Sequence, residues 1–469
     1  MFKRTLLATL VATTLAGCAI GPDYTRPVAD LPTAWPGASA NVAAVDHQWW
    51  TGFGDPVLDS LVGEALTYNR DLAAAAARVD EARAAAGLAR ANLLPALNAN
   101  AGYQRARQSA EVTAPGTPLV GDVRQANAVL SWELDLWGRL RRANEAARAE
   151  VTASAANRDA LQLSLAAQVA QTYFQLRALD AQYDIARRTL ESREEALRLR
   201  EKRYRGGMTS ELDYRQAEAE AASARSTVPS LRQSVEQTEH ALAVLVGRSP
   251  RALVEGPVGR GKALGAFVPP PVVPAGLPSD LLVRRADVAA AEAQLVAANA
   301  RIGVARAAYL PTISLTGALG SESTSLSGLF SGPARTWSFV GNLAAPIFDF
   351  GRTAAGVEAA NARQRQALAG YERALQTAFA ETLDALSQGR AARERQQAEA
   401  TRLAALNEAL RLARLRYDNG YATYLDVLDA ERGVFQAELS LVDTRLAALN
   451  ASVSLYKALG GGWQQVPQG

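Results

Sequence analysis

The stretch RYDNGYATYLDVLDAE, residues 416–431, has an earlier counterpart in RYRGGMTSELDYRQAE, residues 203–218. Arg-Tyr, a Gly three residues after the Tyr, Leu-Asp and Ala-Glu recur in the same places, 213 residues apart. Gly207 and Gly420 suit the positive φ of a tight turn, and a Ser or Thr stands where the following helix would begin. The repetition predicts that the chain builds the same helical hairpin twice.

The repetition extends through most of the chain. Three further matches are Gly138-Arg139 with Gly351-Arg352, Gly247 with Gly460, and NLLPALNANAGY from Asn92 with AYLPTISLTGAL from Ala308. Internal similarity at a fixed spacing indicates repeated structural units. We therefore expect two tandem repeats, residues 56–247 and 280–460. The proline-rich stretch 248–279 would join them without regular helix, because proline removes a backbone donor and fixes φ.

Each repeat has the same expected order of elements. Helices come first, followed by a β-hairpin at about 96–137 or 311–350, a long helix, the glycine turn and a returning helix. Between Gly138 and Tyr204 the chain has no proline and no further glycine, which predicts one helix of about 67 residues. Such a helix would be roughly 100 Å long. Apolar residues spaced in alternating steps of three and four are typical of a coiled coil.

The hairpins carry alternating apolar and polar residues. The apolar set of the first is Leu130, Trp132, Leu134 and Leu136, and that of the second includes Trp337, Phe339, Leu343 and Ile347. Segments of about ten residues with this alternation fit membrane β-barrel strands, although a half-buried sheet in a soluble domain has the same period. Four strands cannot close a barrel, and lipid tolerates no open sheet edge. We therefore expect a barrel shared between chains, in a number that the strand pattern does not set.

The N-terminus, MFKRTLLATLVATTLAGCAIG, predicts a signal peptide at residues 1–17, with a basic start and an apolar run. Leu-Ala-Gly before Cys18, the only cysteine, resembles a bacterial lipobox, so Cys18 is the expected site of a covalent lipid. Several acyl chains would anchor the chain firmly, and Ala19 favours the outer over the inner membrane. An ordinary leader with a chance cysteine is the alternative. Residues 18–55 would be the lipidated N-terminal segment and residues 461–469 a C-terminal tail.

Composition excludes several functional classes. The net charge is +3 at pH 7, with both signs alternating along the helices, which is unlike a nucleic-acid-binding surface. His47, His240 and one cysteine leave little material for a metal site or a nucleophile–base pair, so we expect no catalytic residues, metal or cofactor. No run of 18 apolar residues exists to form a transmembrane helix.

The lipobox, GPDYTRP soon after it, the duplicated unit and RYxxGxxxxLDVLxAE together resemble the TolC superfamily of outer-membrane factors. The closest resemblance is to the NodT-type lipoproteins of resistance-nodulation-division (RND) efflux systems, from Gly21 to about Trp463. It implies a homotrimer with a 12-stranded outer-membrane β-barrel, continuous with a long coiled-coil α-barrel that crosses the periplasm.

The resemblance also implies partners and a function. The channel would dock to a periplasmic adaptor (membrane fusion) protein and an RND-type inner-membrane pump, which supplies the energy. The channel itself would be a passive exit duct for drugs or other small toxic molecules, gated at its periplasmic mouth. A type I protein-secretion duct, or less readily a periplasmic coiled-coil scaffold lipoprotein, is the alternative.

Acidic residues follow both glycine turns. Asp213 and Asp426 stand three residues after a Ser or a Thr, which is the spacing of a capping box. Asp429 has no such role, and it shares a helix face with Asp426. Around a symmetric pore the two would form stacked acidic rings that favour cations.

The resemblance implies that Asp426 and Asp429 constrict the periplasmic mouth. It implies that Asp213 and Tyr417 belong to a latch between neighbouring coils. The best-known members carry an arginine two residues after the turn glycine, where this chain has Ala422. The basic partner in the latch therefore stays open among Arg205, Arg416 and Arg432.

Overall fold

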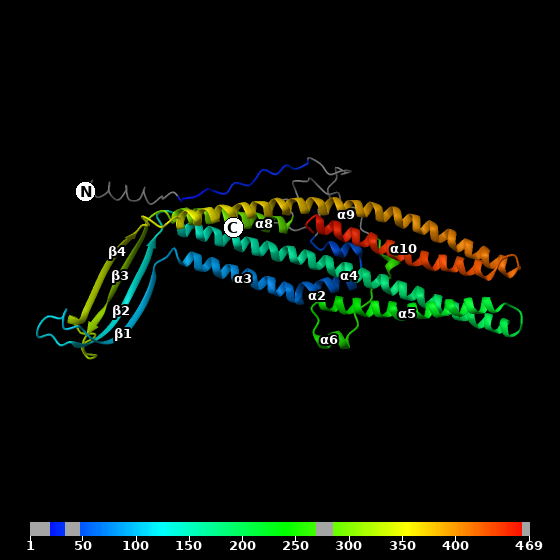
Figure 1. The fold of residues 1–469 in the computed structure, drawn as a ribbon, viewed down its shortest axis with the longest axis horizontal. Coiled ribbons are helices and arrows are strands. Elements are labelled where there is room, and N and C mark those ends of the chain that lie inside the picture. The colour runs from blue at the N-terminus through cyan, green and yellow to red at the C-terminus, as the bar shows by residue number, and fades with distance from the viewer. Residues whose placement is uncertain (1–18, 33–46, 269–284, 462–469) are drawn as a thin grey trace. The chain divides into compact units, whose positions relative to one another are not determined.

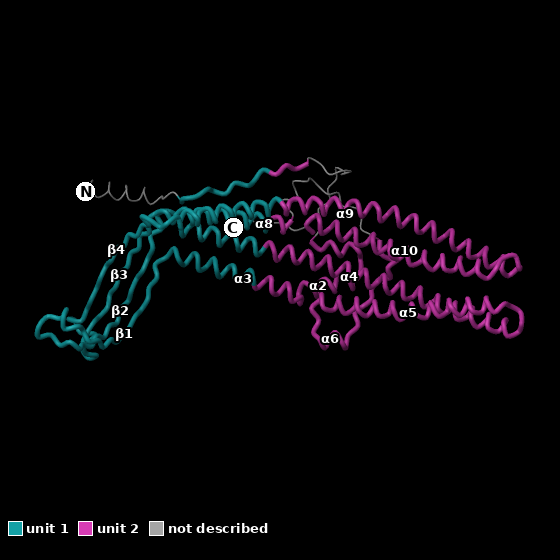
Figure 2. Tube along the Cα trace, viewed as in Figure 1, with its two compact units in different colours: residues 1–28, 78–155, 290–372 teal, residues 29–77, 156–289, 373–469 magenta. Residues whose placement is uncertain are grey.

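The computed structural model describes residues 19–32, 47–268 and 285–461. Cys18, the expected lipid site, lies outside these residues, as does the expected signal peptide. The chain divides into two compact units (Figure 2). Unit 1 comprises Met1–Val28, Arg78–Ala155 and Ala290–Glu372, and unit 2 comprises Ala29–Ala77, Ala156–Ala289 and Arg373–Gly469. Each unit takes segments from both sequence repeats, because the long helices run through both.

Apart from the first helix of the first repeat, which has no counterpart among the described residues, the two repeats have the same order of elements (Figure 1). In the first they are α2 (Pro56–Tyr68), α3 (Arg70–Ala91), β1 (Ala96–Arg107), β2 (Val120–Leu134), α4 (Arg139–Arg205) and α5 (Glu211–Leu245). In the second they are α8 (Ala286–Ala307), β3 (Thr312–Ser323), β4 (Arg335–Ala344), α9 (Arg352–Asp418) and α10 (Tyr424–Ala458). Both α4 and α9 have 67 residues, and both α5 and α10 have 35. The duplication seen in the sequence is thus a duplication of structure.

The stretch 248–279 was expected to contain no regular helix, and this was wrong for its first residues. It holds the short helix α6 (Pro250–Glu255). Ser249 caps this helix by accepting the Ala252 N–H at 3.3 Å. Pro250 occupies the first turn, where its missing N–H has no intrahelical partner to lose. Proline therefore begins a helix here instead of preventing one.

Unit 1 contains a four-stranded antiparallel sheet in the order β1-β2-β3-β4 (Figure 1). Leu97 pairs with Leu130, Leu130 with Gly317, and Gly317 with Phe339. Directly paired residues share a face, so the register gathers most of the large apolar side chains on one face and most of the Asn, Gln, Ser and Thr side chains on the other. The apolar members are Leu97, Ala99, Ala101, Ala126, Ala128, Leu130, Trp132, Leu134, Ile313, Leu315, Leu319, Trp337, Phe339 and Leu343. The alternation predicted from the sequence is present.

No helix in the described part of the chain is both long and apolar enough to cross a membrane.

Aromatic side chains form the main core of unit 2. Trp49 stacks on Tyr456 at 5.4 Å between ring centroids, and Phe174 packs against Phe53 and Phe267. Beside them the buried carboxylate of Asp55 accepts hydrogen bonds from the Tyr173 hydroxyl at 2.8 Å and, within the chain that returns after α6, the Lys262 N–H at 3.0 Å. This part of the molecule is held by aromatic packing and by the hydrogen bonds to the buried Asp55 carboxylate.

Residues 19–26, which include most of the GPDYTRP motif, form a strap across unit 1. The Ile20 N–H donates to the Trp137 carbonyl at 3.0 Å. Gly21 and Gly303 of α8 lie against one another, and a Cβ on Gly21 would come within 2.5 Å of the Gly303 Cα. Both positions need glycine because the backbones meet there.

Ion pairs hold the rest of the strap. The Arg142 guanidinium of α4 donates to the Asp23 carboxylate at 2.6 Å. The Glu292 carboxylate of α8 accepts hydrogen bonds from the Arg26 guanidinium at 2.6 Å and from the Tyr24 hydroxyl at 3.0 Å. Arg142 is buried, so its pairing with Asp23 matters more than an exposed pair would. The strap therefore fixes the chain that follows Cys18 beside Trp137, where β2 gives way to α4.

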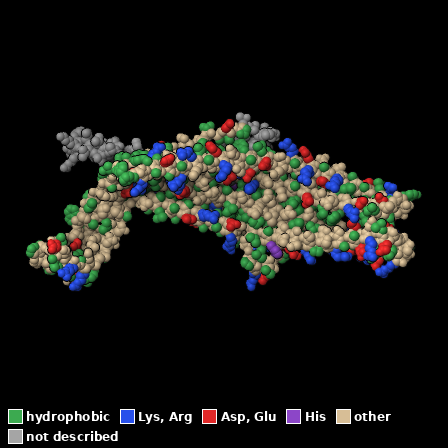
Figure 3. Space-filling model, in the orientation of Figure 1, with side chains coloured by type: hydrophobic (Ala, Val, Ile, Leu, Met, Phe, Trp, Pro, Cys, Tyr) green, Lys and Arg blue, Asp and Glu red, His purple; other side chains and the backbone are tan. Residues whose placement is uncertain are grey.

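Charge is distributed without large single-sign areas on the face of the described residues shown in Figure 3, where Lys and Arg lie among Asp and Glu over the helices. This agrees with the mixed charge pattern of the sequence.

Candidate functional site

Two helix turns in unit 2 carry the residues singled out in the sequence. The first tip (residues 203–216) joins α4 to α5, and the second tip (residues 416–429) joins α9 to α10. In each, a glycine has positive φ, +69° at Gly207 and +79° at Gly420. The N–H of the residue after each glycine returns to a carbonyl in the last helical turn, at 2.8 Å in both tips. This is a Schellman C-cap, for which the glycine is needed.

The second tip also has a complete capping box. The Thr423 hydroxyl accepts the Asp426 N–H at 3.4 Å, and the Asp426 carboxylate accepts the Thr423 N–H at 2.7 Å. The first tip has half of it: Ser210 accepts the Asp213 N–H at 3.1 Å, but the Asp213 carboxylate takes the Thr209 hydroxyl instead, at 2.6 Å. The capping spacing predicted for both tips is therefore used fully in only one.

The two aspartates of the second tip have different surroundings. Hydrogen bonds from the hydroxyl and then the N–H of Thr423 lower the pKa of Asp426, with a smaller effect from Arg416. Asp426 is thus an ionised cap. Asp429 has a side chain 63% exposed and pairs only with Arg432 of its own helix, at 3.1 Å. It contributes nothing to the cap and presents a carboxylate to solvent in the single chain.

The structure brings Tyr417 together with an arginine that the sequence did not single out. Arg200 of α4 is 7% exposed, and its Nη1 donates to the Tyr417 hydroxyl at 2.5 Å. The same guanidinium lies 4.7 Å from the ring centroid of Tyr417 and 4.2 Å from that of Tyr424. Arg200 therefore joins the first helical hairpin to the second by a charged hydrogen bond and cation–π contacts.

The three candidate arginines have other partners. Arg205 pairs with Glu201 one turn earlier, Arg416 donates to the Tyr421 carbonyl at 3.3 Å, and Arg432 pairs with Asp429 and Glu220. Arg432 thus does link the two hairpins, but through Glu220 of α5. The carboxylate of Asp213 bonds within its own tip.

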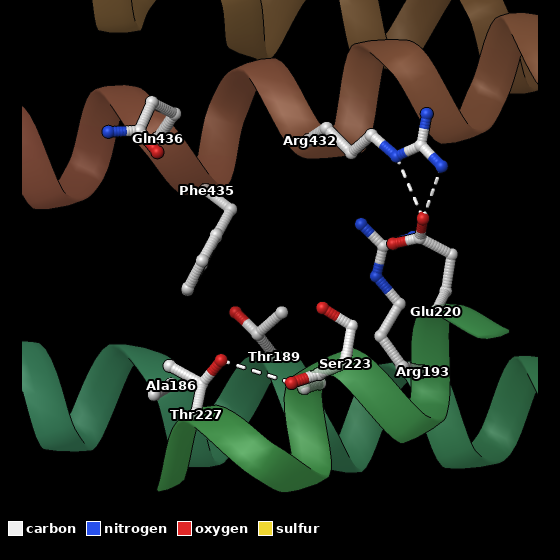
Figure 4. Close-up of a pocket in the computed structure, with 10 residues that line it drawn as sticks. Ala186, Thr189, Arg193, Glu220, Ser223, Thr227, Arg432, Phe435 and Gln436 are labelled. Atoms are coloured by element: carbon white, nitrogen blue, oxygen red, sulfur yellow. Dashed lines mark hydrogen bonds and ion pairs between the residues drawn. The ribbon is translucent and has the colours of Figure 1, made fainter. Parts of the chain in front are cut away.

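A chain of alternating charges lies farther from the turns and joins all four helices. Its successive members are Arg414 (α9), Glu431 (α10), Arg193 (α4), Glu220 (α5), Arg432 (α10) and Asp429 (α10). Arg193 is buried and lies 3.1 Å from Glu431 and 3.3 Å from Glu220. Figure 4 shows Arg193, Glu220 and Arg432 converging. Removing one member of a buried pair leaves an uncompensated charge, which is costly.

The hairpins are not tightly packed at this level. A pocket of about 270 Å³ lies beside the charge chain, with Phe435 and Gln436 of α10 on one side and Thr189, Ser223 and Thr227 on the other (Figure 4). An interior of close-packed side chains would leave no such space. At the level of this pocket polar pairs join the two hairpins, and nearer the turns a small buried apolar cluster of α5 and α10 joins them as well.

The described residues contain no group of three His, Cys, Asp or Glu side chains spaced to hold a metal ion.

Comparison with known proteins decides the family. The sequence profile of outer membrane efflux proteins matches residues 61–248 and 277–461. The chain belongs to the outer membrane efflux protein family. It is 38% identical over 464 residues to outer membrane protein OprJ of Pseudomonas aeruginosa, covering 98% of this chain and 96% of OprJ.

Solved structures give the same result. The Campylobacter jejuni CmeC outer membrane channel superposes with a TM-score of 0.91 at 27% identity, covering 96% of each chain. The open state of the Neisseria gonorrhoeae MtrE outer membrane channel gives a TM-score of 0.85 at 35% identity, covering 96% of this chain and 100% of MtrE. The fold is that of the TolC superfamily, as the sequence motifs predicted, and the protein is an outer-membrane channel of an efflux system.

Removal of the Thr423 hydroxyl tests the cap of the second tip. In Thr423→Ala, amide exchange in the first turn of α10 should be about fivefold faster, as loss of an N-cap predicts. Ser210→Ala, the matched change, should loosen α5 and leave α10 unchanged. Equal protection in all three proteins would contradict the capping role.

The same cap has a pH dependence. Because the pKa of Asp426 is lowered, the stability it contributes is present above the usual carboxyl pKa of about 3.9 and is lost as pH falls through the lowered value. A nitroxide label at the exposed Leu425 should therefore gain mobility only in acid, and at higher pH in Thr423→Ala.

Proposed function

We propose that the second tip is the gate of this channel at its periplasmic mouth. The Arg200–Tyr417 contact and the charge chain form the latch that keeps the mouth narrow. The channel is a passive exit duct for drugs or other small toxic molecules, performs no chemistry itself, and is driven by an RND-type inner-membrane pump through a periplasmic adaptor. The observation that carries the proposal is the buried Arg200, which holds Tyr417 and Tyr424 of the other hairpin.

The latch consists of contacts that can separate as a set. Moving the α9–α10 hairpin away from the α4–α5 hairpin would break the Arg200–Tyr417 bond and the pairs of Arg193 and Arg432 together. The buried guanidinium groups would then gain water in exchange for their lost partners, which offsets part of the cost. Two arrangements separated by a modest free energy are what a gate biased by an adaptor or pump requires.

The acidic residues give the mouth its charge selectivity. In a homotrimer, Asp426 and Asp429 supply six carboxylates, and Asp213 lies at the corresponding place of the first tip. Asp429 is the stronger determinant, since its carboxylate is exposed and is not used in a cap. Gln216 stands at its counterpart in the first tip, so only the second tip has the extra charge.

Assembly and anchoring complete the proposal. The sheet has an open edge at β1 and another at β4, and lipid permits neither, which supports a homotrimer with a 12-stranded barrel. Cys18 carries the covalent lipid, because the strap begins at the next residue and is held beside Trp137 at the end of β2. The lipid would then enter the outer membrane next to the barrel.

Tyr417→Phe and Arg200→Ala test the latch. Loss of a hydrogen bond to a buried charged group costs about 1.5–3 kcal/mol, so the open-to-closed ratio should rise roughly tenfold or more. Conductance of the purified channel in planar bilayers should increase accordingly. Tyr417→Phe keeps the ring and so limits damage to folding. Arg205→Ala removes an exposed arginine of the first tip, one and a half helical turns beyond Arg200, and should leave conductance unchanged. Wild-type conductance in both latch variants would refute the latch.

The acidic mouth predicts a change in ion selectivity. Asp429→Asn should shift the reversal potential in a KCl gradient toward that of a nonselective pore, and Asp426→Asn should shift it less. The double change Asp429→Asn with Gln216→Asp moves the carboxylate to the first tip at constant net charge. If that variant keeps the cation preference of the wild type, the second tip is not the selective one.

Metabolic labelling tests the anchor. Wild-type protein expressed in bacteria should incorporate palmitate, and Cys18→Ala should incorporate none, because the thiol and the new amino terminus would be absent. Label retained in Cys18→Ala would exclude this residue as the attachment site.

A further inference from the structure

All basic residues of the sheet lie on one face and near one end of it. The four strands contain no lysine and four arginines, Arg105, Arg107, Arg124 and Arg335. The register places them on the same face as Leu130 and Leu319, because cross-strand partners share a face and side chains alternate along each strand. We call these four residues the arginine band.

The two faces of the sheet differ in charge. Besides the arginine band, the apolar face carries one acidic residue, Asp122. The opposite face carries Glu133 and Glu322 and no basic residue. Four positive charges therefore stand against one negative charge on the apolar face, whereas the polar face is acidic.

The band lies toward the end of the strands that is farther from the helices. α3 and α8 lead into β1 and β3, and α4 and α9 follow β2 and β4, so the helices join one end of the sheet (Figure 1). The hairpin loops, residues 108–119 and 324–334, are at the other end. Arg107 is the last residue of β1 and Arg335 the first of β4. The loops themselves carry a single charged residue, Glu111.

The length of the apolar face sets the depth of the band. Leu134 and Arg124 are ten residues apart in β2, which is about 34 Å along the strand. Strands of membrane barrels are tilted by roughly 40°, so this length gives a height of about 26 Å, close to the apolar band of about 25 Å in such barrels. With Leu134 at the headgroups of one leaflet, the arginine band lies at the headgroups of the other.

Aromatic residues mark the same level. The Arg124 guanidinium lies 4.8 Å from the ring centroid of Tyr103, its partner across the strands. Trp337, 80% exposed, is two residues from Arg335 on the same face. Tyrosine and tryptophan are enriched where a membrane meets water, and an arginine on a lipid-facing surface costs least there.

Most of the charge of the band is not neutralised within the chain. Among the described residues, the side chains of Arg107 and Arg335 form no ion pair or hydrogen bond, and both residues are exposed. Arg105 lies 3.8 Å from Asp122 and its side chain is 66% exposed. Exposed guanidinium groups bind phosphate through paired N–H donors.

We propose that the arginine band binds phosphate groups on the headgroups of lipids in the leaflet at the loop end of the sheet. The acyl chains of such a lipid lie along the apolar face, and its phosphates meet the guanidinium groups where that face ends. The inference rests on the proposed function, in which the sheet is part of an outer-membrane barrel, and goes beyond it by assigning a lipid site. A soluble acidic partner would meet the loops first, and these carry no basic residue.

Lipid binding to the purified full-length channel in an uncharged detergent tests the site. The probe is fluorescently labelled lipid A, a glycolipid with two phosphates, and the reference probe is the same lipid after removal of both phosphates. The wild type should bind the phosphorylated probe more tightly. In Arg107→Gln with Arg335→Gln, affinity for it should fall about 25-fold, at roughly fivefold for each arginine, with no change for the reference probe.

Two further variants test the charge itself. Arg107→Lys with Arg335→Lys keeps the positive charges but not the planar fork of donors, so it should bind more tightly than the glutamine variant and less tightly than the wild type. Asp122→Asn removes the one acidic residue of the face and keeps an acceptor for the Tyr103 hydroxyl, which donates to Asp122 at 2.9 Å. Its affinity should rise roughly fivefold.

A matched control lies on the helices. Arg232→Gln with Arg251→Gln makes the same change of net charge at exposed residues of α5 and α6 and should leave both affinities unchanged. Inorganic phosphate should displace the lipid no better than chloride does at equal ionic strength, because it has no acyl chains to lie along the apolar face.

The outcomes distinguish this site from the channel. Equal affinity of the wild type for both probes would overturn the proposal, and so would an equal loss in the control variant or an unchanged affinity in Asp122→Asn. Displacement by inorganic phosphate would overturn the assignment to a lipid headgroup. Conductance in planar bilayers should be the same in the wild type and the glutamine variant, and a wild type that forms no conducting pore would contradict the proposed channel instead.

Discussion

The open edges of a four-stranded sheet with one apolar face are the constraint on which the rest of the molecule depends. In lipid every backbone N–H and C=O at such an edge needs a protein partner. In the described residues β2 and β3 are paired on both sides, whereas β1 and β4 each have one open edge. Copies must therefore meet edge to edge.

The aromatic core of unit 2 and the contacts between its two helical hairpins are held by different forces. The first suits a fixed scaffold, and the second suits hairpins that separate when the proposed gate opens. Around Trp49, Phe53 and Phe174 the core is aromatic and buried, and separating it would expose much apolar surface. Between the hairpins the apolar cluster is much smaller, and Arg193 and Arg200 are buried against carboxylates and tyrosines. A buried ion pair contributes little net stability because desolvation offsets its attraction. Contacts of that kind hold the two hairpins in one arrangement, yet they leave the free energy of separating the hairpins moderate.

Much of this architecture could be predicted from the sequence because it rests on local rules. A long run without proline or interior glycine predicted α4, alternation predicted the faces of the sheet, and Gly207 and Gly420 predicted the turns. The latch could not be predicted. Arg193 and Arg200 lie in runs of mixed charge that look like a solvated helix face, and their partners on the other hairpin, Glu431 and Tyr417, are more than 200 residues away. The cap of Asp213 was mispredicted in detail because Thr209 competes for its carboxylate.

Duplication also explains why the two tips are unequal. After duplication, one seam between the repeats stays inside the chain, where the strap holds α4 and α8 together through Arg142 and Glu292. The first and second tips are likewise free to diverge, because each needs only the glycine turn and a cap to fold. The second keeps a full capping box, so Asp429 is available for another purpose, whereas its counterpart in the first tip is the uncharged Gln216. Charge at the mouth can thus change in one tip without weakening the hairpin that carries it.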